Sequence, residues 1–196
     1  KMFTDVPTLR TRQHILLYWQ AGWFKSTLLR QFRKVVPDQF KSVMLTTVST
    51  AMLTGSIYIP KYPMSKPRLI PPVFAGVDFV FISEHAAFLG QAAERREKIS
   101  IMNDVLEGEK VSKTLVKFGY VEIDLLQATE LQEKHIIYDP SEATITYEPD
   151  VCVFAASMPF DKMTFSLLRR SGHWDRFHVV QHNITDEESK AYLRQT

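Results

Sequence analysis

The sequence contains a single cysteine, Cys152, among its 196 residues. One cysteine cannot form an internal disulfide or a cysteine-based zinc site, and such sparse use fits a reducing compartment. We therefore expect an intracellular, cytoplasmic protein. No apolar run approaches the roughly 20 residues of a membrane span, and the first residues lack the pattern of a signal peptide, so we expect no membrane contact.

The chain also lacks an excess of charge. Its 24 Lys and Arg residues against 22 Asp and Glu residues give a net charge of +2, so any contact with DNA must come from a local patch. A hydrophobic content of 45% and a charged content of 23% are ordinary for a globular protein. The length suits one domain with a sizeable core, which we expect to span residues 1–196.

Five short apolar runs predict buried strands. They are residues 14–19, 42–48, 78–84, 150–157 and 177–182. Near-continuous hydrophobicity over such lengths is typical of a parallel sheet covered on both faces. Helical stretches at residues 28–36, 86–107 and 160–170 separate the runs. The alternation predicts an α/β domain in which a parallel five-stranded sheet lies between two layers of helices, an αβα arrangement.

Two stretches interrupt the alternation. Residues 53–77 hold half of the ten prolines, and Pro-rich loops of this length in a compact domain are usually functional or disordered. Residues 111–149 contain two alternating segments, 111–118 and 143–148, which we interpret as strands of a β-hairpin-like insertion. The alternative is that both stretches are family-specific surface excursions.

A P-loop pattern follows the first strand. In a P-loop, backbone N–H groups and a helix dipole bind phosphate, a Lys reaches the terminal phosphates, and a Ser or Thr hydroxyl holds Mg²⁺. Trp19 and Phe24 stand where the usual pattern has glycine, and a helix is expected to begin at Leu28. The alternative is a buried strand followed by an amphipathic helix with one exposed Lys. The predicted nucleotide-binding residues are Gly22, Trp23, Phe24, Lys25, Ser26 and Thr27.

Polar residues end two later strands of the predicted sheet, and ligands of open α/β sheets lie at the carboxyl ends of strands. Glu84 can polarise the water that attacks a γ-phosphate, and the residue before it, here the uncharged Ser83, commonly supports Mg²⁺. The alternative is an ordinary strand end at which Ser83 caps the next helix. Ser157, followed by Met158, stands where many ATPases carry a residue that orients this water.

Three arginines follow the helix predicted at residues 160–170: Arg169, Arg170 and Arg176. A guanidinium that reaches the γ-phosphate of a neighbouring subunit acts as an arginine finger. For Arg169 or Arg170 the alternative is a solvated basic helix end, which the helix dipole favours.

In this order the segments resemble the core of AAA+ P-loop ATPases over nearly the whole chain, and most of all the minichromosome-maintenance (MCM) helicases. The segments that carry the resemblance are LTGSIY (53–58), FVFISEH (79–85), residues 101–119, VFAASMP (153–159) and LLRRSGHWDRF (167–177). The resemblance implies ATP and Mg²⁺ as cofactors. Its implied roles are phosphate binding for Lys25, Mg²⁺ binding for Ser26 and Ser83, catalytic base for Glu84, sensor for Ser157 and arginine finger for Arg176.

The resemblance also implies a DNA-binding surface. Residues 53–77 match a helix-2 insertion and residues 101–119 lead into a β-hairpin before sensor 1; in that family both face a central channel and touch DNA. Lys113 and Lys117 are therefore candidate DNA contacts, and the alternative is that both are solvated positions of an alternating strand. Residues 183–196 match the start of a lid subdomain, of which the remainder is missing.

The implied function is an ATP-dependent motor that forms a homo-oligomeric, hexameric ring on single- or double-stranded DNA, most plausibly a replicative-type helicase. Four positions depart from the family pattern: Trp19, Phe24, Ser83 and Met158. They leave three alternatives open. In the first, the chain is an interaction protein that binds nucleotide without hydrolysing it. In the second it is a DNA-packaging or remodelling ATPase, and in the third it is an unrelated α/β binding protein.

Overall fold

The structure is a computed structural model. The residues that it describes are 13–20, 24–59, 61, 67–89, 92–115, 121 and 123–182. The expected lid segment at residues 183–196, together with Gly22, Trp23 and Lys117, lies outside this set.

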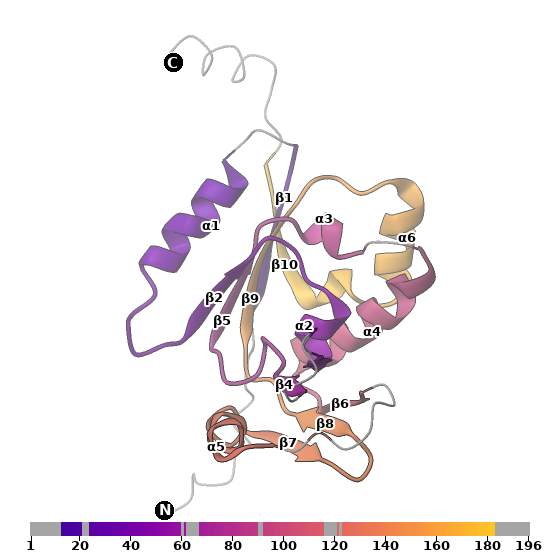
Figure 1. Ribbon diagram of the computed structural model, residues 1–196. Coiled ribbons are helices and arrows are strands. Elements are labelled where there is room, and N and C mark those ends of the chain that lie inside the picture. The colour runs from indigo at the N-terminus through magenta and orange to yellow at the C-terminus, as the bar shows by residue number, and fades with distance from the viewer. Residues whose placement is uncertain are drawn as a thin grey trace, which may run out of the picture.

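A five-stranded parallel sheet forms the centre of the fold (Figure 1). Its strands are β1 (His14–Tyr18), β2 (Ser42–Leu45), β5 (Phe79–Ile82), β9 (Cys152–Ser157) and β10 (Phe177–Gln181). Each strand lies within one of the five apolar runs, so the prediction of a parallel five-stranded sheet is confirmed. The spatial order β10-β1-β9-β5-β2 places the first strand inside the sheet, between the fourth and the fifth.

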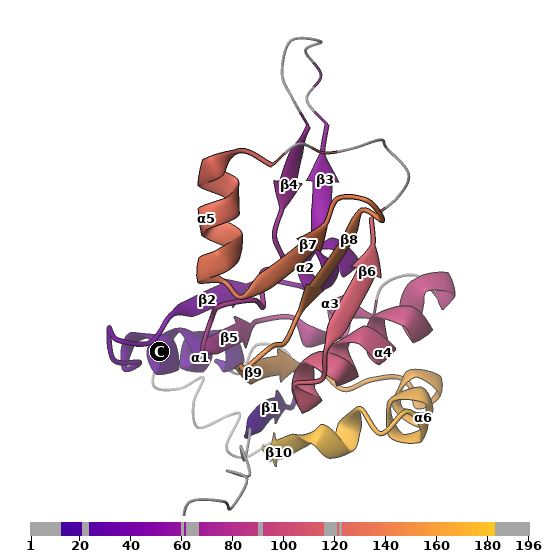
Figure 2. The same ribbon diagram turned by 90° about the horizontal axis from the view of Figure 1, so that it is seen from below.

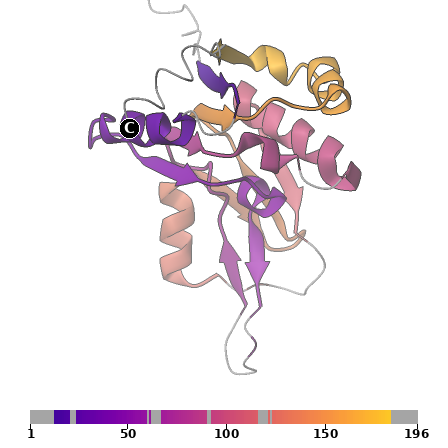
Figure 3. The same ribbon diagram turned by 90° about the horizontal axis from the view of Figure 1, so that it is seen from above.

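Helices cover both faces of this sheet. Helix α1 (Lys25–Lys34) lies on one face, and four helices lie on the other (Figures 1 and 3). These four are α2 (Thr50–Thr54), α3 (His85–Phe88), α4 (Ala92–Glu107) and α6 (Lys162–Arg170). The expected single helix over residues 86–107 is wrong, because the chain forms α3 and α4 as separate helices.

The core lies mainly on the four-helix face of the sheet. There the inward residues of the central strands, such as Leu16, Val80 and Val153, are fully buried. A smaller apolar cluster lies under α1, where Leu29 packs with Leu17 and Phe81. The two clusters together therefore stabilise the main sheet, whose strand ends carry the loops.

The Pro-rich insertion is partly a two-stranded antiparallel ribbon. Strands β3 (Ser56–Tyr58) and β4 (Arg68–Ile70) pair with Ile57 opposite Leu69. The positive φ of 78° at Gly55, which ends α2, turns the chain into this ribbon. A Cβ at this glycine would lie 2.7 Å from Cδ1 of Ile145, so the turn packs directly on the second insertion.

The second insertion forms a small antiparallel sheet of its own, in the order β6-β8-β7 (Figure 2). Its strands are β6 (Val111–Thr114), β7 (Ile136–Asp139) and β8 (Thr144–Tyr147), and α5 (Leu125–Glu133) packs beside β7. The predicted pairing of a strand near residue 111 with one near residue 144 is confirmed, whereas β7 and α5 are additional. Since β8 runs into β9 after four residues, this small sheet lies at the amino edge of the main sheet.

Candidate functional site

A cleft lies at the carboxyl edge of the main sheet, with a cavity volume of about 730 Å³. Its walls come from three segments far apart in the chain, namely residues 24–27 after β1, residues 83–84 and 86–87 after β5, and residues 156–158 at the end of β9. The predicted site residues Lys25, Ser26, Glu84 and Ser157 therefore lie around one cavity.

The path of the chain explains why a cleft opens there. From β1 the chain turns to α1 on one face of the sheet, whereas from the adjacent β9 it passes to α6 on the other face. Two neighbouring strands whose connections leave in opposite directions create a crevice at their carboxyl ends, which is where open α/β sheets bind ligands.

Lys25 begins α1 and its side chain folds back onto the end of β1. Its Nζ donates to the carbonyl oxygens of Trp19 at 2.7 Å and Gln20 at 2.5 Å, and lies 5.5 Å from the centre of the Trp19 ring. Only 8% of Lys25 is exposed, and this burial lowers the pKa of its ammonium group. The alternative of a buried strand followed by an amphipathic helix is therefore wrong in one respect, because Lys25 is buried rather than exposed.

Phe24 precedes α1 in a conformation that suits glycine. Its φ of 52° and ψ of 9° are left-handed, while 56% of its side chain is exposed. P-loops carry glycine at this position, and glycine adopts a positive φ without a steric cost. Phe24 thus adopts a backbone conformation that suits glycine although the residue is bulky.

The first turn of α1 faces the cleft without a competing carboxylate. Helix α1 begins at Lys25 rather than at Leu28 as expected, which places Ser26 and Thr27 in the first turn. Phe24 provides no side-chain cap, and α1 has no acidic residue in this turn. Uncapped N–H groups and the positive end of the helix dipole favour an anion.

Glu84 reaches the cleft from the end of β5. The N–H groups of Ser83 and Glu84 donate to the carbonyl oxygens of Leu45 at 2.9 Å and Thr46 at 2.8 Å, which extends the β2–β5 pairing beyond the strand. Helix α3 begins at His85 with Glu84 as its N-cap residue. Ser83 therefore does not cap the helix, and the exposed Glu84 makes no side-chain cap hydrogen bond.

Ser157 ends β9 on the floor of the cleft. The residue is buried, lies opposite Tyr18 in the register of β1 and β9, and donates its hydroxyl hydrogen to the Met158 carbonyl oxygen at 2.8 Å. The Tyr18 hydroxyl accepts a hydrogen bond from the Phe160 N–H group at 2.9 Å, so the loop after β9 is fixed to β1. Sequence reasoning did not identify Tyr18, which appears there as one apolar-run residue among many.

The available ligands in the cleft fit an Mg²⁺ ion bound to a phosphate ester. The cleft offers the hydroxyl oxygens of Ser26 and Ser83 and one carboxylate, Glu84, and Mg²⁺ is commonly held by few protein oxygens, substrate phosphates and water. Within the described ranges, no three His, Cys, Asp or Glu residues gather as a metal site.

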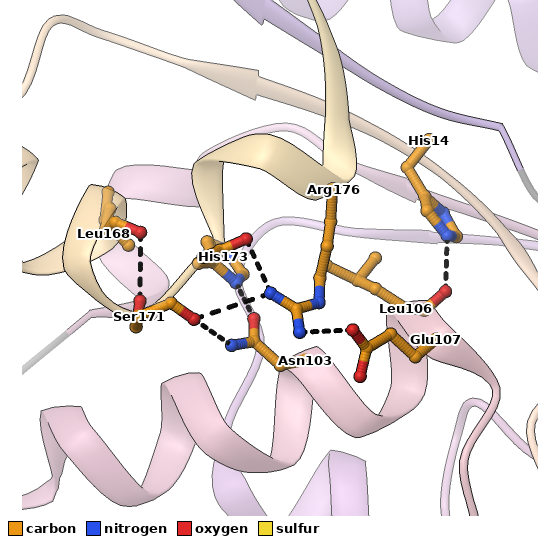
Figure 4. A network of polar contacts seen from close by, with 9 residues as sticks. His14, Asn103, Leu106, Glu107, Leu168, Ser171, His173 and Arg176 are labelled. Carbon is orange, nitrogen blue, oxygen red and sulfur yellow. Dashed lines mark hydrogen bonds and ion pairs between the residues drawn. The ribbon is translucent and has the colours of Figure 1, made fainter.

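Arg176 lies away from the cleft of its own chain. It ends the 3-10 helix η1 (Trp174–Arg176) and directly precedes β10, whose first residue, Phe177, pairs with His14 at the start of β1. A five-residue strand is about 16 Å long, which separates Arg176 from the carboxyl edge. Its guanidinium donates to the Gly172 carbonyl oxygen at 2.6 Å and pairs with Glu107 (Figure 4). Arg169 and Arg170 lie in the exposed last turn of α6.

Lys113 lies on β6, remote from the cleft, and its Nζ forms an ion pair with Glu97 of α4. It lines a second, smaller cavity of about 290 Å³ between the two insertions, together with Gly55 and Ser56.

The comparisons with known proteins do not identify a family. No protein-family model matches the chain, and no curated protein matches it significantly. Within the described part of the chain, no helix combines the length and the apolar character needed to span a bilayer.

Proposed function

We propose that the chain is a P-loop ATPase domain of the AAA+ type, which binds ATP with Mg²⁺ in the cleft and works as a ring-forming motor on DNA. The observation that carries the proposal is the convergence of Lys25, Glu84 and Ser157 on one cavity at the carboxyl edge of the sheet. These residues come from the ends of three different strands, and each has a chemical type that phosphoryl transfer uses.

In this proposal the first turn of α1 binds the phosphates. Its N–H groups and dipole face the anion, and Lys25 exchanges two carbonyl oxygens for phosphate oxygens. Because Lys25 is already desolvated at its present position, this exchange costs little further dehydration. Ser26 and Ser83 would hold Mg²⁺, which would neutralise phosphate charge.

Hydrolysis requires a group that orients water, and Glu84 is the candidate. Its carboxylate is exposed to the cleft and is not used as a helix cap, so it is available to accept a proton from water. Ser157, on the floor of the cleft, helps to hold that water in line. Arg176, at the far edge of the sheet, serves the cleft of a second copy, which is why the proposal includes a ring.

The DNA part of the proposal depends on the resemblance to MCM helicases. The β3–β4 ribbon and the β6–β8–β7 sheet form the end of the molecule remote from the cleft (Figures 1 and 2). Lys113 is the candidate contact there, and binding to DNA phosphate would replace its ion pair with Glu97. Lys117 is the other candidate.

A second candidate function is nucleotide binding without hydrolysis, as a structural switch. It is favoured by the uncharged Ser83 before Glu84 and by Met158, which is exposed at the cleft beside Ser157. Both residues weaken the binding of Mg²⁺ and the orientation of the attacking water, whereas the turn that binds phosphate is unaffected.

ATP binding and hydrolysis by the wild type, Lys25→Ala and Glu84→Gln, with and without single-stranded DNA, test the proposal. Lys34→Ala, in the last turn of α1, and Glu148→Gln, on the surface, are matched controls. We expect DNA-stimulated hydrolysis that both cleft variants lose and both controls retain. Binding lost only in Lys25→Ala, with no hydrolysis by any variant, would favour the switch. Absence of binding in the wild type would reject both functions.

A further inference from the structure

A buried chain of hydrogen bonds runs from the residue next to Glu84 to the turn that holds Arg176. His85, the first residue of α3, lies with its Nε2 atom 3.1 Å from Nε2 of His173, which is 88 positions further along the chain. The Nδ1 atom of His173 lies 2.6 Å from Oδ1 of Asn103 on α4. All three side chains are buried.

The partners assign a direction to every bond in this chain. The Asn103 Nδ2 group donates to the Ser171 carbonyl oxygen at 3.0 Å, so its Oδ1 accepts and His173 carries its proton on Nδ1. Both rings are fully buried and lie against each other, which favours the neutral imidazole in each. The Nε2 atom of His173 is then an acceptor, and His85 donates from Nε2.

This assignment leaves a lone pair on Nδ1 of His85. That atom is buried and has no hydrogen-bond partner among the atoms that the structure describes. A buried acceptor without a partner is destabilising, because it has lost its hydrogen bond to water. The His85 ring stacks on Phe88 at 5.6 Å, a contact that a phenyl ring would make equally well without that cost. Packing alone therefore does not explain an imidazole at this position, whereas donation to His173 does.

At the other end, the same turn holds Arg176. Ser171 and Gly172 accept hydrogen bonds from the Arg176 guanidinium, at 3.5 Å and 2.6 Å, next to the bond from Asn103 (Figure 4). Glu107, one helical turn after Asn103 on α4, pairs with the guanidinium from the other side. One face of α4 thus holds both His173 and Arg176.

We propose that His85 and His173 are positioning residues, whose hydrogen bond fixes the Arg176 turn to α3, the helix that follows the cleft residue Glu84. This inference rests on the proposed function, in which Glu84 acts in its own cleft and Arg176 acts in the cleft of a second copy. Because interior hydrogen bonds cannot be broken without leaving polar atoms unpaired, α3 and the turn at residues 171–176 move together. The link places the two acting groups of one subunit at a fixed separation.

Turnover at saturating ATP, together with the ATP dissociation constant, tests the link through His85→Phe and His85→Gln. We expect His85→Phe to lower kcat at least tenfold with the dissociation constant unchanged within twofold. His85→Gln places an amide N–H near the former Nε2 and should recover at least half of kcat. In the double variant with Arg176→Ala, kcat should be no lower than in Arg176→Ala alone. Fully additive losses, or a loss of ATP affinity instead of kcat, would overturn the proposal.

Nitrogen NMR tests the same link without nucleotide. We expect His173 in the Nδ1–H tautomer and His85 in the Nε2–H tautomer, and an Arg176 Nε–H signal that shifts in His85→Phe but not in His178→Phe, a change on the exposed part of β10. The opposite tautomers or an unchanged Arg176 signal would reject the link. If the wild type fails to bind ATP while these signals behave as expected, the proposed function fails and the link itself stands.

Discussion

Phe24 offers a direct test of the turn before α1, through a comparison of Phe24→Gly with Phe24→Ala. Both variants remove the ring, so the loss of its partly buried surface is the same in each. Alanine keeps a Cβ at a φ of 52° and so retains the left-handed strain of about 1–2 kcal/mol. Glycine removes that strain at an entropic cost of about 0.5–1 kcal/mol. The free energy of unfolding of Phe24→Gly should therefore exceed that of Phe24→Ala by about 1 kcal/mol.

The matched control lies within the same helix. Gln31 is exposed in the interior of α1, where glycine is about 1 kcal/mol worse than alanine. Gln31→Gly should thus be less stable than Gln31→Ala, the reverse of the order at Phe24. Urea unfolding followed by circular dichroism measures both differences. A Phe24→Gly variant that is less stable than Phe24→Ala would refute the left-handed conformation at position 24, on which the proposed phosphate-binding turn depends.

The same two variants separate the backbone from the ring in nucleotide binding. Phe24 lines the cleft, so removing its ring should tighten binding of ATP with Mg²⁺ in both variants. If Phe24→Gly binds more tightly than Phe24→Ala, the relaxed turn itself contributes to affinity. Weaker binding in both variants would mean that the ring contacts the nucleotide rather than obstructing it.

Three further outcomes follow from buried groups. Since the pKa of His85 is about 4 when folded and about 6.5 when unfolded, its contribution to the free energy of unfolding is full well above pH 6.5 and falls as the pH drops from 6.5 to 4, by about 2 kcal/mol at pH 5. Burial also lowers the pKa of His173, so urea unfolding at pH 8 and pH 5 should show a drop that is smaller, but still present, in His85→Phe. Tyr147→Phe removes the 2.5 Å hydrogen bond to the Leu53 carbonyl oxygen and should lower the free energy of unfolding by about 1–2 kcal/mol in the same assay. Gly172→Ala would bring a Cβ within 2.8 Å of Arg176 Nη1 at a φ of 68°; it should shift the Arg176 Nε–H signal and lower the melting temperature, and an unchanged signal would contradict the described turn.

The strands of the main sheet could be predicted because a strand that is buried on both faces needs a short, almost continuous run of apolar residues. Few other structures show this pattern. Even so, the strands are shorter than the runs at several ends, as for residues 42–48, of which only 42–45 form β2. The sequence predicts a start of α1 that is three residues too late, because Phe24 is not a capping residue type and gives no local signal of a helix boundary.

Other features depend on contacts between distant segments and could not be predicted. Strands β3, β4 and β7 have three or four residues each, too few for a clear alternation, and their pairing is decided by tertiary packing. The sequence predicts residues that line the cleft, but it does not predict that the Lys25 side chain folds back onto the end of β1. The His85–His173 pair joins positions 88 residues apart, and its only sequence signal is one histidine in each of two segments that resemble AAA+ ATPases.

The two insertions join the main sheet at the edge opposite the cleft. Their strands lead directly into β5 and β9 from the amino side, so residues can be added to or removed from their turns without moving the carboxyl ends of those strands. Such an architecture lets selection reshape one end of the molecule while the other end keeps its chemistry.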